Sequence, residues 1–224
     1  MGLIEKSANT MHRQHGWFTS DSYTNAPAGS WGAKDNNLFE RLGDIKTVNQ
    51  GVPDPKLHTI VRTPRWFLDS GVTVGNWVNK GAVPGGLASL SIKLEFDSKY
   101  AIACFLSEHN EVQMDNLDAV GDALVDLYRK PGKDWKLNRK WVYTALEVKS
   151  GFILMSREKN TTVTLSGQGT VNASGVPIKL NVDGFVNSAS SSVEMVGLEN
   201  VTPFLKLCEV YDPVFAKADW HQIG

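Results

Sequence analysis

The sequence predicts an α+β fold with a large, mostly antiparallel twisted sheet, amphipathic hairpins and two or more packed helices. Three observations predict it. Segments that alternate apolar and polar residues, as half-buried strands do, recur through much of the chain. Helical spacing of apolar residues occurs in two segments, 1–15 and 115–130. The order is therefore helix, strands, helix, strands, which is typical of the α+β class.

The composition is that of an ordinary soluble globular protein. The 224 residues are 42% hydrophobic and 21% charged, with a formal net charge of -1, which excludes disorder and collagen and argues against a protein that coats nucleic acid. No apolar run approaches the roughly 18 residues of a spanning helix, and no secretory signal is present. We expect a cytoplasmic protein with reduced thiols at Cys104 and Cys208. Without a visible domain boundary, residues 1–224 form one predicted domain.

The first predicted element is a basic helix over residues 1–15. Apolar residues recur there every three or four positions, Lys6 and Arg13 supply positive charge, and Gly16 ends the helix. Residues 17–37 are rich in Ser, Asn, Gly and Pro, which predicts a loop.

Strands follow the loop. They are predicted at 38–48, 57–63 and 72–78. The clearest alternation in the chain comes next, with the apolar residues Leu90, Ile92, Leu94 and Phe96. A turn at 97–99 leads into the apolar segment 100–106, so residues 87–106 are predicted to form a hairpin.

A second helix is predicted over 115–130, with Asp115 or Asn116 as its cap. Its apolar stripe is Leu117, Val120, Leu124, Leu127 and Tyr128. Further strands are predicted at 141–149, 152–157, 162–171, 176–185, 191–196 and 203–211, before a polar tail. Alternation returns at Val176, Ile178, Leu180 and Val182, and we take 152–196 as a second hairpin region.

No enzyme motif stands out. The glycines at 81–86 lead into a strand and lack the Lys and Ser or Thr of a phosphate-binding loop, and no nucleophile elbow is present. His12 and His15 share a helix without further ligands nearby, which favours solvated histidines over a metal site. We therefore expect no catalytic residue, no cofactor and no metal.

Three features point toward a lipid surface. The alternating strands suit a sheet packed on protein, and equally a membrane barrel whose apolar side meets lipid. At Arg62, Arg65, Trp66, Phe67 and Leu68, large apolar side chains follow two arginines near a predicted strand end. Such a loop tip suits insertion at a bilayer surface, while the alternative is that the aromatic residues fold back into the core.

The third feature is a short basic patch with aromatic residues. It consists of Arg129, Lys130, Lys133, Lys136, Arg139 and Lys140, with Trp135 inside and Trp141 at its end. Each cation near an anionic leaflet contributes about 1 kcal/mol, so several together could hold a protein on a membrane. The alternative is a solvated charged loop.

Together these features resemble the pore-forming N-terminal domain of gasdermins, in particular the fungal regulator-of-cell-death group. The order matches: a basic first helix, a loop with Arg62, Pro64, Trp66 and Phe67, a hairpin at 87–106 and a helix at 115–130. Segment 141–148 resembles the Val-Tyr-x-x-Thr-Glu-x-Leu type of strand that opens the second hairpin region of that family. The likeness covers most of the chain.

The resemblance implies a cytoplasmic form that moves to the plasma membrane, binds acidic phospholipid and oligomerises. Two hairpin regions then refold into a transmembrane β-barrel that kills the cell, in some members during allorecognition. By position, Lys6 and Arg13 resemble the lipid-binding charges, and Trp66, Phe67 and Leu68 resemble the membrane anchor.

A chain ending at Gly224 leaves no room for the autoinhibitory C-terminal domain of animal gasdermins. It is either an active fragment or a single-domain member, and we expect the latter, restrained by needing a variant of the same protein as partner in a hetero-oligomer. Homo-oligomers are the other arrangement. Two other functions remain open from the residues: a soluble binding module with a basic docking face, and an enzyme whose site lies on loops.

Overall fold

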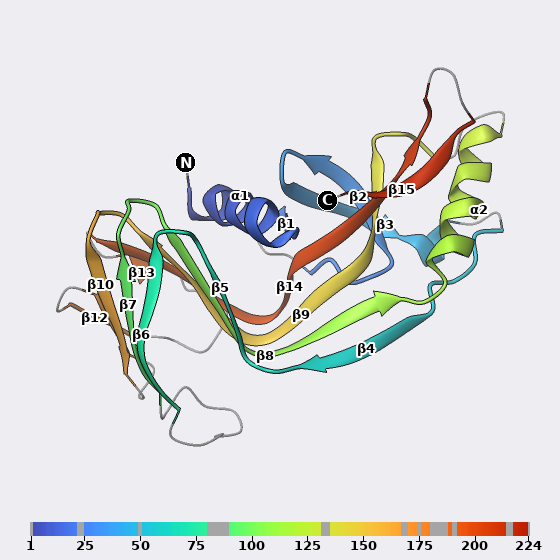
Figure 1. Ribbon diagram of the computed structural model, residues 1–224. Coiled ribbons are helices and arrows are strands. Elements are labelled where there is room, and N and C mark those ends of the chain that lie inside the picture. Colours follow the sequence, from blue (N-terminus) through green and yellow to red (C-terminus); the bar gives the residue numbers. More distant parts are fainter. Residues whose placement is uncertain are drawn as a thin grey trace. The chain divides into compact units, whose positions relative to one another are not determined.

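The computed structural model describes residues 2–21, 25–48, 51–79, 90–130, 135–166, 170–173, 176–179, 188–189, 192–213 and 217–223. Their fold is α+β, as predicted, with helices α1 (Leu3–His15) and α2 (Leu117–Arg129) and strands arranged in two sheets (Figure 1). Among the candidate membrane-binding residues, Lys133, Leu180 and Val182 lie outside the described residues. For four others only the backbone is described: Leu90, Ile92, Val176 and Ile178.

The chain forms two compact units, each built from three segments. Unit 1 comprises Met1–Thr10, Thr63–Glu108 and Val148–Asn200. Unit 2 comprises Met11–Arg62, His109–Glu147 and Val201–Gly224. Helix α1 and the long strands β8 (Ile102–Met114), β9 (Arg139–Ser156) and β14 (Val193–Tyr211) contribute residues to both units.

The larger sheet has ten strands among the described residues, in the order β13-β14-β1-β3-β2-β9-β8-β4, with β15 added to β14 and β5 to β8. Its shorter strands are β1 (Phe18–Ser20), β2 (Ser30–Asp35), β3 (Leu38–Asp44), β4 (Leu57–Arg62), β5 (Arg65–Leu68), β13 (Ser188–Ala189) and β15 (Asp219–Ile223). Strands β1 and β3 pair in parallel. Most neighbours pair antiparallel, so the predicted sheet type is confirmed.

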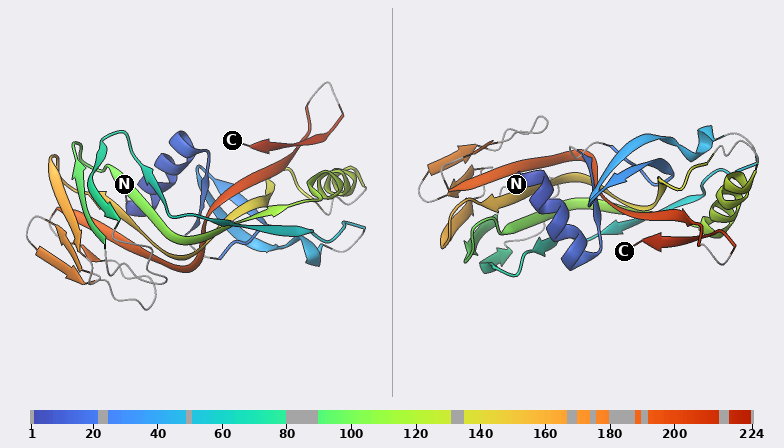
Figure 2. Two further views of the ribbon diagram at one scale, coloured as in Figure 1. Left: turned by 60° about the horizontal axis from the view of Figure 1, so that its bottom comes forward. Right: turned by 90° about the horizontal axis from the view of Figure 1, so that it is seen from above.

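The smaller sheet has five strands in the described part of the chain and lies within unit 1 (Figure 2). Its order is β12-β11-β10-β7-β6. The strands are β6 (Val72–Asn79), β7 (Leu90–Phe96), β10 (Thr161–Ser166), β11 (Thr170–Ala173) and β12 (Val176–Lys179). Every pairing within it is antiparallel.

One apolar core joins the small sheet to the part of the large sheet that belongs to unit 1. Its buried members are Leu94, Phe96, Ala101, Ala103, Phe105, Phe152, Leu154, Val163, Val193 and Met195. In β7 the alternation is as predicted, because Leu94 and Phe96 are buried while Lys93 and Glu95 are exposed. Burial of each large apolar side chain contributes about 1.5–3 kcal/mol, so this core is the main reason why the two sheets stay packed.

Unit 2 is built around helix α2. The helix buries its predicted stripe, with Val120, Leu124, Leu127 and Tyr128 in one cluster with Trp135, Trp141 and Cys208 from elsewhere in the unit. Strand β15 packs on the helix at Gly121, where a Cβ atom would lie 2.5 Å from the Trp220 indole. Trp220 Nε1 also donates to Asp122 Oδ1 over 3.1 Å. A glycine is therefore required at 121.

The predicted hairpin at 87–106 is wrong. Strand β7 pairs with β6 and β10 in the small sheet, whereas β8 pairs with β4, β5 and β9 in the large one. The physical reason lies in the composition of 101–106, all of which is buried. A strand without alternation must be covered on both faces, so β7 belongs to the layer that covers β8 instead of lying beside it.

Smaller differences from the expected elements share one cause, which is pairing with distant strands. The loop expected at 17–37 contains β1 and β2, and the polar tail contains β15. The two strands expected at 141–149 and 152–157 are the single strand β9. Gly151 lets β9 continue beside β8, because a Cβ atom there would lie 2.6 Å from the Phe105 carbonyl oxygen.

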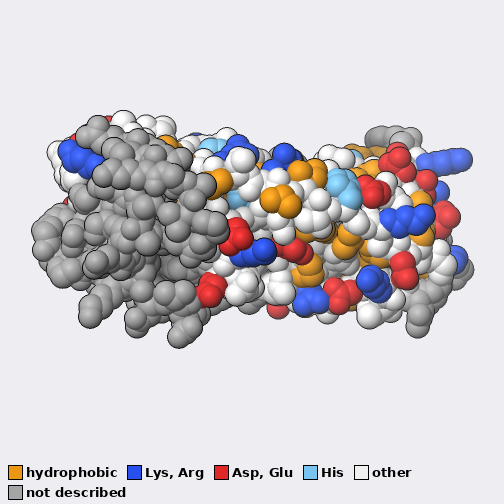
Figure 3. All heavy atoms as spheres, turned by 90° about the horizontal axis from the view of Figure 1, so that it is seen from below, with side chains coloured by type: hydrophobic (Ala, Val, Ile, Leu, Met, Phe, Trp, Pro, Cys, Tyr) orange, Lys and Arg blue, Asp and Glu red, His pale blue; other side chains and the backbone are white. Residues whose placement is uncertain are grey.

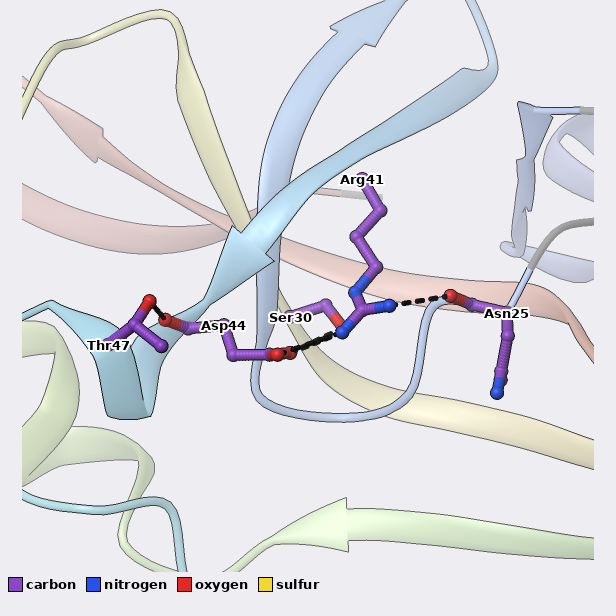
Figure 4. Close-up of polar contacts among 5 residues, drawn as sticks. All are labelled: Asn25, Ser30, Arg41, Asp44 and Thr47. Carbon is purple, nitrogen blue, oxygen red and sulfur yellow. Dashed lines mark hydrogen bonds and ion pairs between the residues drawn. The ribbon is translucent and has the colours of Figure 1, made fainter.

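Strand β3 ends at Asp44, earlier than the alternation predicts, where a 3-10 turn (Ile45–Thr47) begins. The Arg41 guanidinium bonds both carboxylate oxygens of Asp44, at 2.9 and 2.8 Å, and reaches the Asn25 carbonyl at 3.5 Å (Figure 4). The hydroxyl of Ser30 donates to the same carboxylate, and that of Thr47 donates to the Asp44 carbonyl over 2.7 Å. These contacts fix the end of the strand.

Candidate functional site

The most unusual feature of unit 1 is a crease at which neighbouring segments of the polypeptide pass from one sheet to the other. We use this name for three bends, 69–71, 97–100 and 157–160, together with Ser192. They connect β5 to β6, β7 to β8 and β9 to β10, and Ser192 precedes β14. The strands that these bends connect lie side by side on both sides of the crease (Figure 1).

Backbone hydrogen bonds join each bend to the next. Asp69 N–H donates to the Ile102 carbonyl over 2.9 Å, and Tyr100 N–H donates to the Ser156 carbonyl over 2.7 Å. Arg157 N–H donates to the Ser192 carbonyl over 2.7 Å. The crease is therefore one continuous line across four segments of the polypeptide.

The order of the strands is the same on both sides of the crease. In the large sheet β5 pairs with β8, which pairs with β9. In the small sheet their continuations β6, β7 and β10 pair in the same order. Straightening the bends would thus convert two stacked layers into one set of longer strands without exchanging a neighbour.

The bends 97–100 and 157–160 also match in length and register. On one side of them Phe96 pairs with Thr161. On the other side Ser156 N–H donates to the Ala101 carbonyl over 3.0 Å. Since both bends lie between the same two pairing points, their residues can pair one to one in an extended form.

The last residue of each of these bends has a left-handed backbone. Tyr100 has φ of 66° and Asn160 has φ of 55°. Asn tolerates this region, but a residue such as Tyr is disfavoured there by about 1–2 kcal/mol. The bent form therefore carries local strain that an extended form would release.

The bend 69–71 is shorter than the one opposite. Leu68 pairs with Ala103 before it and Val72 pairs with Phe96 after it. Three residues thus face six, and a straightened pair would keep the extra residues as a bulge. Bulges of this kind are common where strands bend.

Residues Lys6 and Arg13, predicted to bind lipid, lie on α1 two helical turns apart and hence on one side of it. The Lys6 side chain is 30% exposed and forms an ion pair with Asp69, while Arg13 is exposed. Nearby on the same helix His12 stacks on Phe18 with ring centroids 4.5 Å apart. Burial lowers the pKa of His12, and the Lys34 charge lowers it further.

The expected anchor loop is wrong, because Trp66, Phe67 and Leu68 lie in strand β5. Phe67 is buried, and the Trp66 ring packs on Phe105 at 4.7 Å and on Phe152 at 5.8 Å. Trp66 and Leu68 pack against the core of unit 1, and Phe67 is buried as well, so all three fold back into the protein, which was the alternative left open. Burial of three such groups outweighs any preference for an exposed tip.

The two arginines beside them are engaged within the protein. Arg65 stacks on the Phe67 ring at 4.6 Å. In unit 2, Arg62 donates to Glu111 Oε2 over 2.9 and 2.6 Å. Burial opposes ionisation of Glu111, but hydrogen bonds from Gln113 and Arg62 and the charges of Arg62 and Lys206 outweigh it, so the pKa of Glu111 is lowered.

The basic patch is only partly a free surface. Lys130 and Lys136 are exposed. Lys140 pairs with Glu209, and Arg129 donates to the Ala218 carbonyl. Arg139 lies 4.6 Å from the centre of the Trp31 ring. The patch thus has two described cations directed to solvent and three that stabilise unit 2.

The aromatic part of the patch is not available to a membrane or a ligand. Trp135 and Trp141 are fully buried. With Trp31 and Trp220 they form a row of indoles, with centroids 5.9 to 6.2 Å apart along it. Trp135 and Trp141 therefore belong to the core around α2 and add nothing to the surface of the patch.

The cysteines lack the properties of a catalytic nucleophile. Both cysteines are free thiols and buried, and burial raises the pKa of Cys104 and of Cys208, which disfavours the nucleophilic thiolate. Within the described ranges no three His, Cys, Asp or Glu side chains gather as metal ligands would.

The surface charge is mixed on the face drawn in Figure 3, where cationic and anionic side chains alternate over the described part. That pattern agrees with the formal net charge of -1. Attraction to an anionic surface would therefore come from small groups of cations, such as Lys6 and Arg13 on α1. It would not be a property of the whole face.

Neither described helix has the length and apolar character needed to cross a bilayer. Comparison with known proteins adds no assignment: no family model matches this chain, and no curated protein matches it either.

Proposed function

We propose that this protein permeabilises membranes containing acidic phospholipid, by oligomerising and inserting the strands of its small sheet after the crease straightens. It has no enzymatic activity in this proposal. The membrane would be the inner face of the plasma membrane, reached from the cytoplasm, and the outcome would be regulated cell death. The resemblance to gasdermins supports this final step.

The observation that carries the proposal is that the strands have the same order on both sides of the crease. Strands β6, β7 and β10 continue β5, β8 and β9 with the same neighbours. If every strand had to find a new neighbour, the hydrogen bonds between strands would break first and the kinetic barrier would be high. Strands that only straighten keep the hydrogen bonds to their present neighbours. Residues 90–100 and 157–166 would then form strands of about the 9 to 11 residues needed to span a bilayer.

The apolar face of the small sheet supplies the driving force. Leu94, Phe96 and Val163 are fully buried, and exposing each to water costs about 1.5–3 kcal/mol. Acyl chains can replace the protein partner at little cost, so the extended form is favoured only where lipid is present. Lys93 and Glu95 on the opposite face are exposed and pair at 2.5 Å, which suits a water-facing side.

Insertion also requires several copies. The described small sheet ends in β6 on one edge and β12 on the other. Unpaired backbone groups cannot remain in hydrocarbon, so each edge must join the edge of a neighbouring copy. The partner is therefore a second copy of this chain or a close variant of it.

The test is dye release from vesicles of phosphatidylcholine with and without phosphatidylserine. We expect release only with the anionic lipid, with this chain alone or mixed with a sequence variant of it, and ring-shaped oligomers in electron micrographs of the same vesicles. No release under any of these mixtures, from protein that unfolds cooperatively and is therefore native, would contradict the proposal and favour a soluble binding module.

A further inference from the structure

The carboxylate of Asp69 connects helix α1 to the crease. Its Oδ2 atom lies 3.8 Å from Lys6 Nζ and accepts a 3.4 Å hydrogen bond from the Thr10 hydroxyl. Its Oδ1 atom accepts a 2.9 Å hydrogen bond from the backbone N–H of Ser70. All of these groups belong to unit 1.

Asp69 is also held by its backbone. Its N–H donates to the Ile102 carbonyl over 2.9 Å, and its carbonyl accepts from Val72 N–H over 3.0 Å. The residue thus bridges β5, β6 and β8 at the bend, while its side chain reaches the helix. The Asp69 side chain is 13% exposed and that of Lys6 is 30% exposed, so the ion pair is partly buried but still reached by solvent.

We propose that Lys6, Thr10 and Asp69 form a latch that keeps the crease bent until a phosphate group takes the place of Asp69 as the partner of Lys6. The inference rests on the proposed function and gives it a trigger. Lys6 is then both the contact that senses an acidic headgroup and the contact that holds the bent form.

The exchange is physically reasonable because a phosphate offers Lys6 the same ligand chemistry as a carboxylate, an anionic oxygen. An ion pair with a separation of 3.8 Å that solvent still reaches contributes little, so a competing anion can break it. Near an acidic leaflet the concentration of such anions is high, and Arg13 on the same side of the helix adds a second contact with the same surface. A ligand shifts an equilibrium only by its preference for one state, and here only the open state leaves Lys6 free for the headgroup.

The first experiment uses hydrogen–deuterium exchange of the full chain without lipid. Asp69→Asn and Lys6→Gln should each raise amide exchange at 69–71 about two- to fivefold, the effect of losing a partly exposed ion pair. The double variant should exchange no faster than either single one. Asp97→Asn, an exposed carboxylate in the neighbouring bend, is the matched control and should leave exchange unchanged.

The second experiment separates the sensing and holding roles of Lys6. In sedimentation with phosphatidylserine vesicles, Asp69→Asn should bind about two- to fivefold more tightly than the wild-type chain, and Lys6→Gln should bind less tightly. The two variants thus open the crease alike and change binding in opposite directions. Asp97→Asn removes the same charge from the neighbouring bend and should leave binding unchanged, so tighter binding by Asp69→Asn alone is not a general effect of net charge.

The ligand source is resolved by three arms with the wild-type chain. Phosphatidylserine vesicles should raise exchange at 69–71, while phosphatidylcholine vesicles and inorganic phosphate at the same ionic strength should not. Equal opening by inorganic phosphate supports the exchange of partners and assigns it to the free anion. If Asp69→Asn leaves amide exchange at 69–71 unchanged without lipid, the latch is wrong, even if the protein releases dye from vesicles. If Asp69→Asn raises that exchange, the latch is supported, even if the protein releases no dye and the proposed function fails.

Discussion

The backbone N–H of Asp97 donates a 2.8 Å hydrogen bond to the carbonyl oxygen of Gly71. This bond joins two bends that lie more than twenty residues apart in the chain, so the β5–β6 and β7–β8 connections turn at one shared line. A Cβ atom on Gly71 would lie 2.6 Å from the Ser98 hydroxyl of the neighbouring bend. A larger residue at 71 would therefore require the Ser98 hydroxyl to rotate away. The hydrogen bond between Asp97 and Gly71 couples the movements of the two bends.

The first prediction concerns the pairs that a straightened crease would create. Continuing the register of Phe96 with Thr161 places Lys99 opposite Glu158. Both side chains are exposed in the bent form, so Lys99→Glu should change the free energy of unfolding by less than about 0.5 kcal/mol. It should slow dye release several-fold, because like charges directly opposite destabilise a strand pair by about 0.2–1 kcal/mol in every copy.

Glu158→Lys in the same chain restores the opposite charges and should restore the rate of release. Lys46→Glu makes the same charge change at an exposed site in unit 2 and serves as control. If the double variant leaks as slowly as Lys99→Glu, the proposed register is wrong.

The left-handed residue Tyr100 gives a second prediction. Tyr100→Gly removes the steric cost of φ at 66° and should stabilise the bent form by about 1 kcal/mol and slow dye release. Tyr100→Val should do the reverse, because β-branched residues favour extended backbone. Urea unfolding and leakage rates measure both effects. Asn36→Gly, a left-handed site at φ 51° in unit 2, should leave the leakage rate unchanged.

Glu111 gives a prediction on pH. Its folded pKa lies below the ordinary value of 4.5, so its stabilising effect is present above pH 4.5 and is lost as the pH falls through the folded pKa. Glu111→Gln should lower the free energy of unfolding by about 1 kcal/mol at pH 7.5 and by less at pH 3.5. Urea unfolding at the two values measures this. An equal loss at both would show that the charge is not the cause, and Glu108→Gln, with a side chain 58% exposed, should change little at either.

A fourth prediction concerns the close approach of β2 and β3. A Cβ atom on Gly32 would lie 1.9 Å from the Glu40 carbonyl oxygen, and backbone cannot yield as a flexible side chain can. Gly32→Ala should therefore destabilise the protein by about 2–4 kcal/mol in thermal or urea unfolding. Gly197→Ala, where nothing lies within 4 Å, should be neutral within about 0.5 kcal/mol. Equal effects of the two variants would show that the register of β2 with β3 is different.

Local patterns in the sequence predict local features well. Alternation from Leu90 to Phe96 correctly gives a strand with Leu94 and Phe96 inside, and helical spacing gives the buried face of α2. These signals depend only on which neighbours in the chain share a face. They carry no information on which strand lies beside which, and so the pairing of β7 with β10 was missed.

The rest depends on contacts between distant residues. Trp66 follows two arginines near a predicted strand end, and only the presence of Phe105 and Phe152 beside it makes its burial favourable. Likewise the basic character of α1 points to Lys6, but nothing near it in the sequence indicates Asp69, its partner in the crease. The matched bends ending at Tyr100 and Asn160 could have been suspected only from Asn160, since Asn favours left-handed backbone.

The central claim is that the crease straightens on a bilayer, and hydrogen–deuterium exchange recorded on the same vesicles that release dye tests it most directly. We expect amides at 98–99 and 158–160 to become protected on phosphatidylserine vesicles, in step with dye release, because they join continuous strands. Dye release while these amides exchange as they do in buffer would contradict the account.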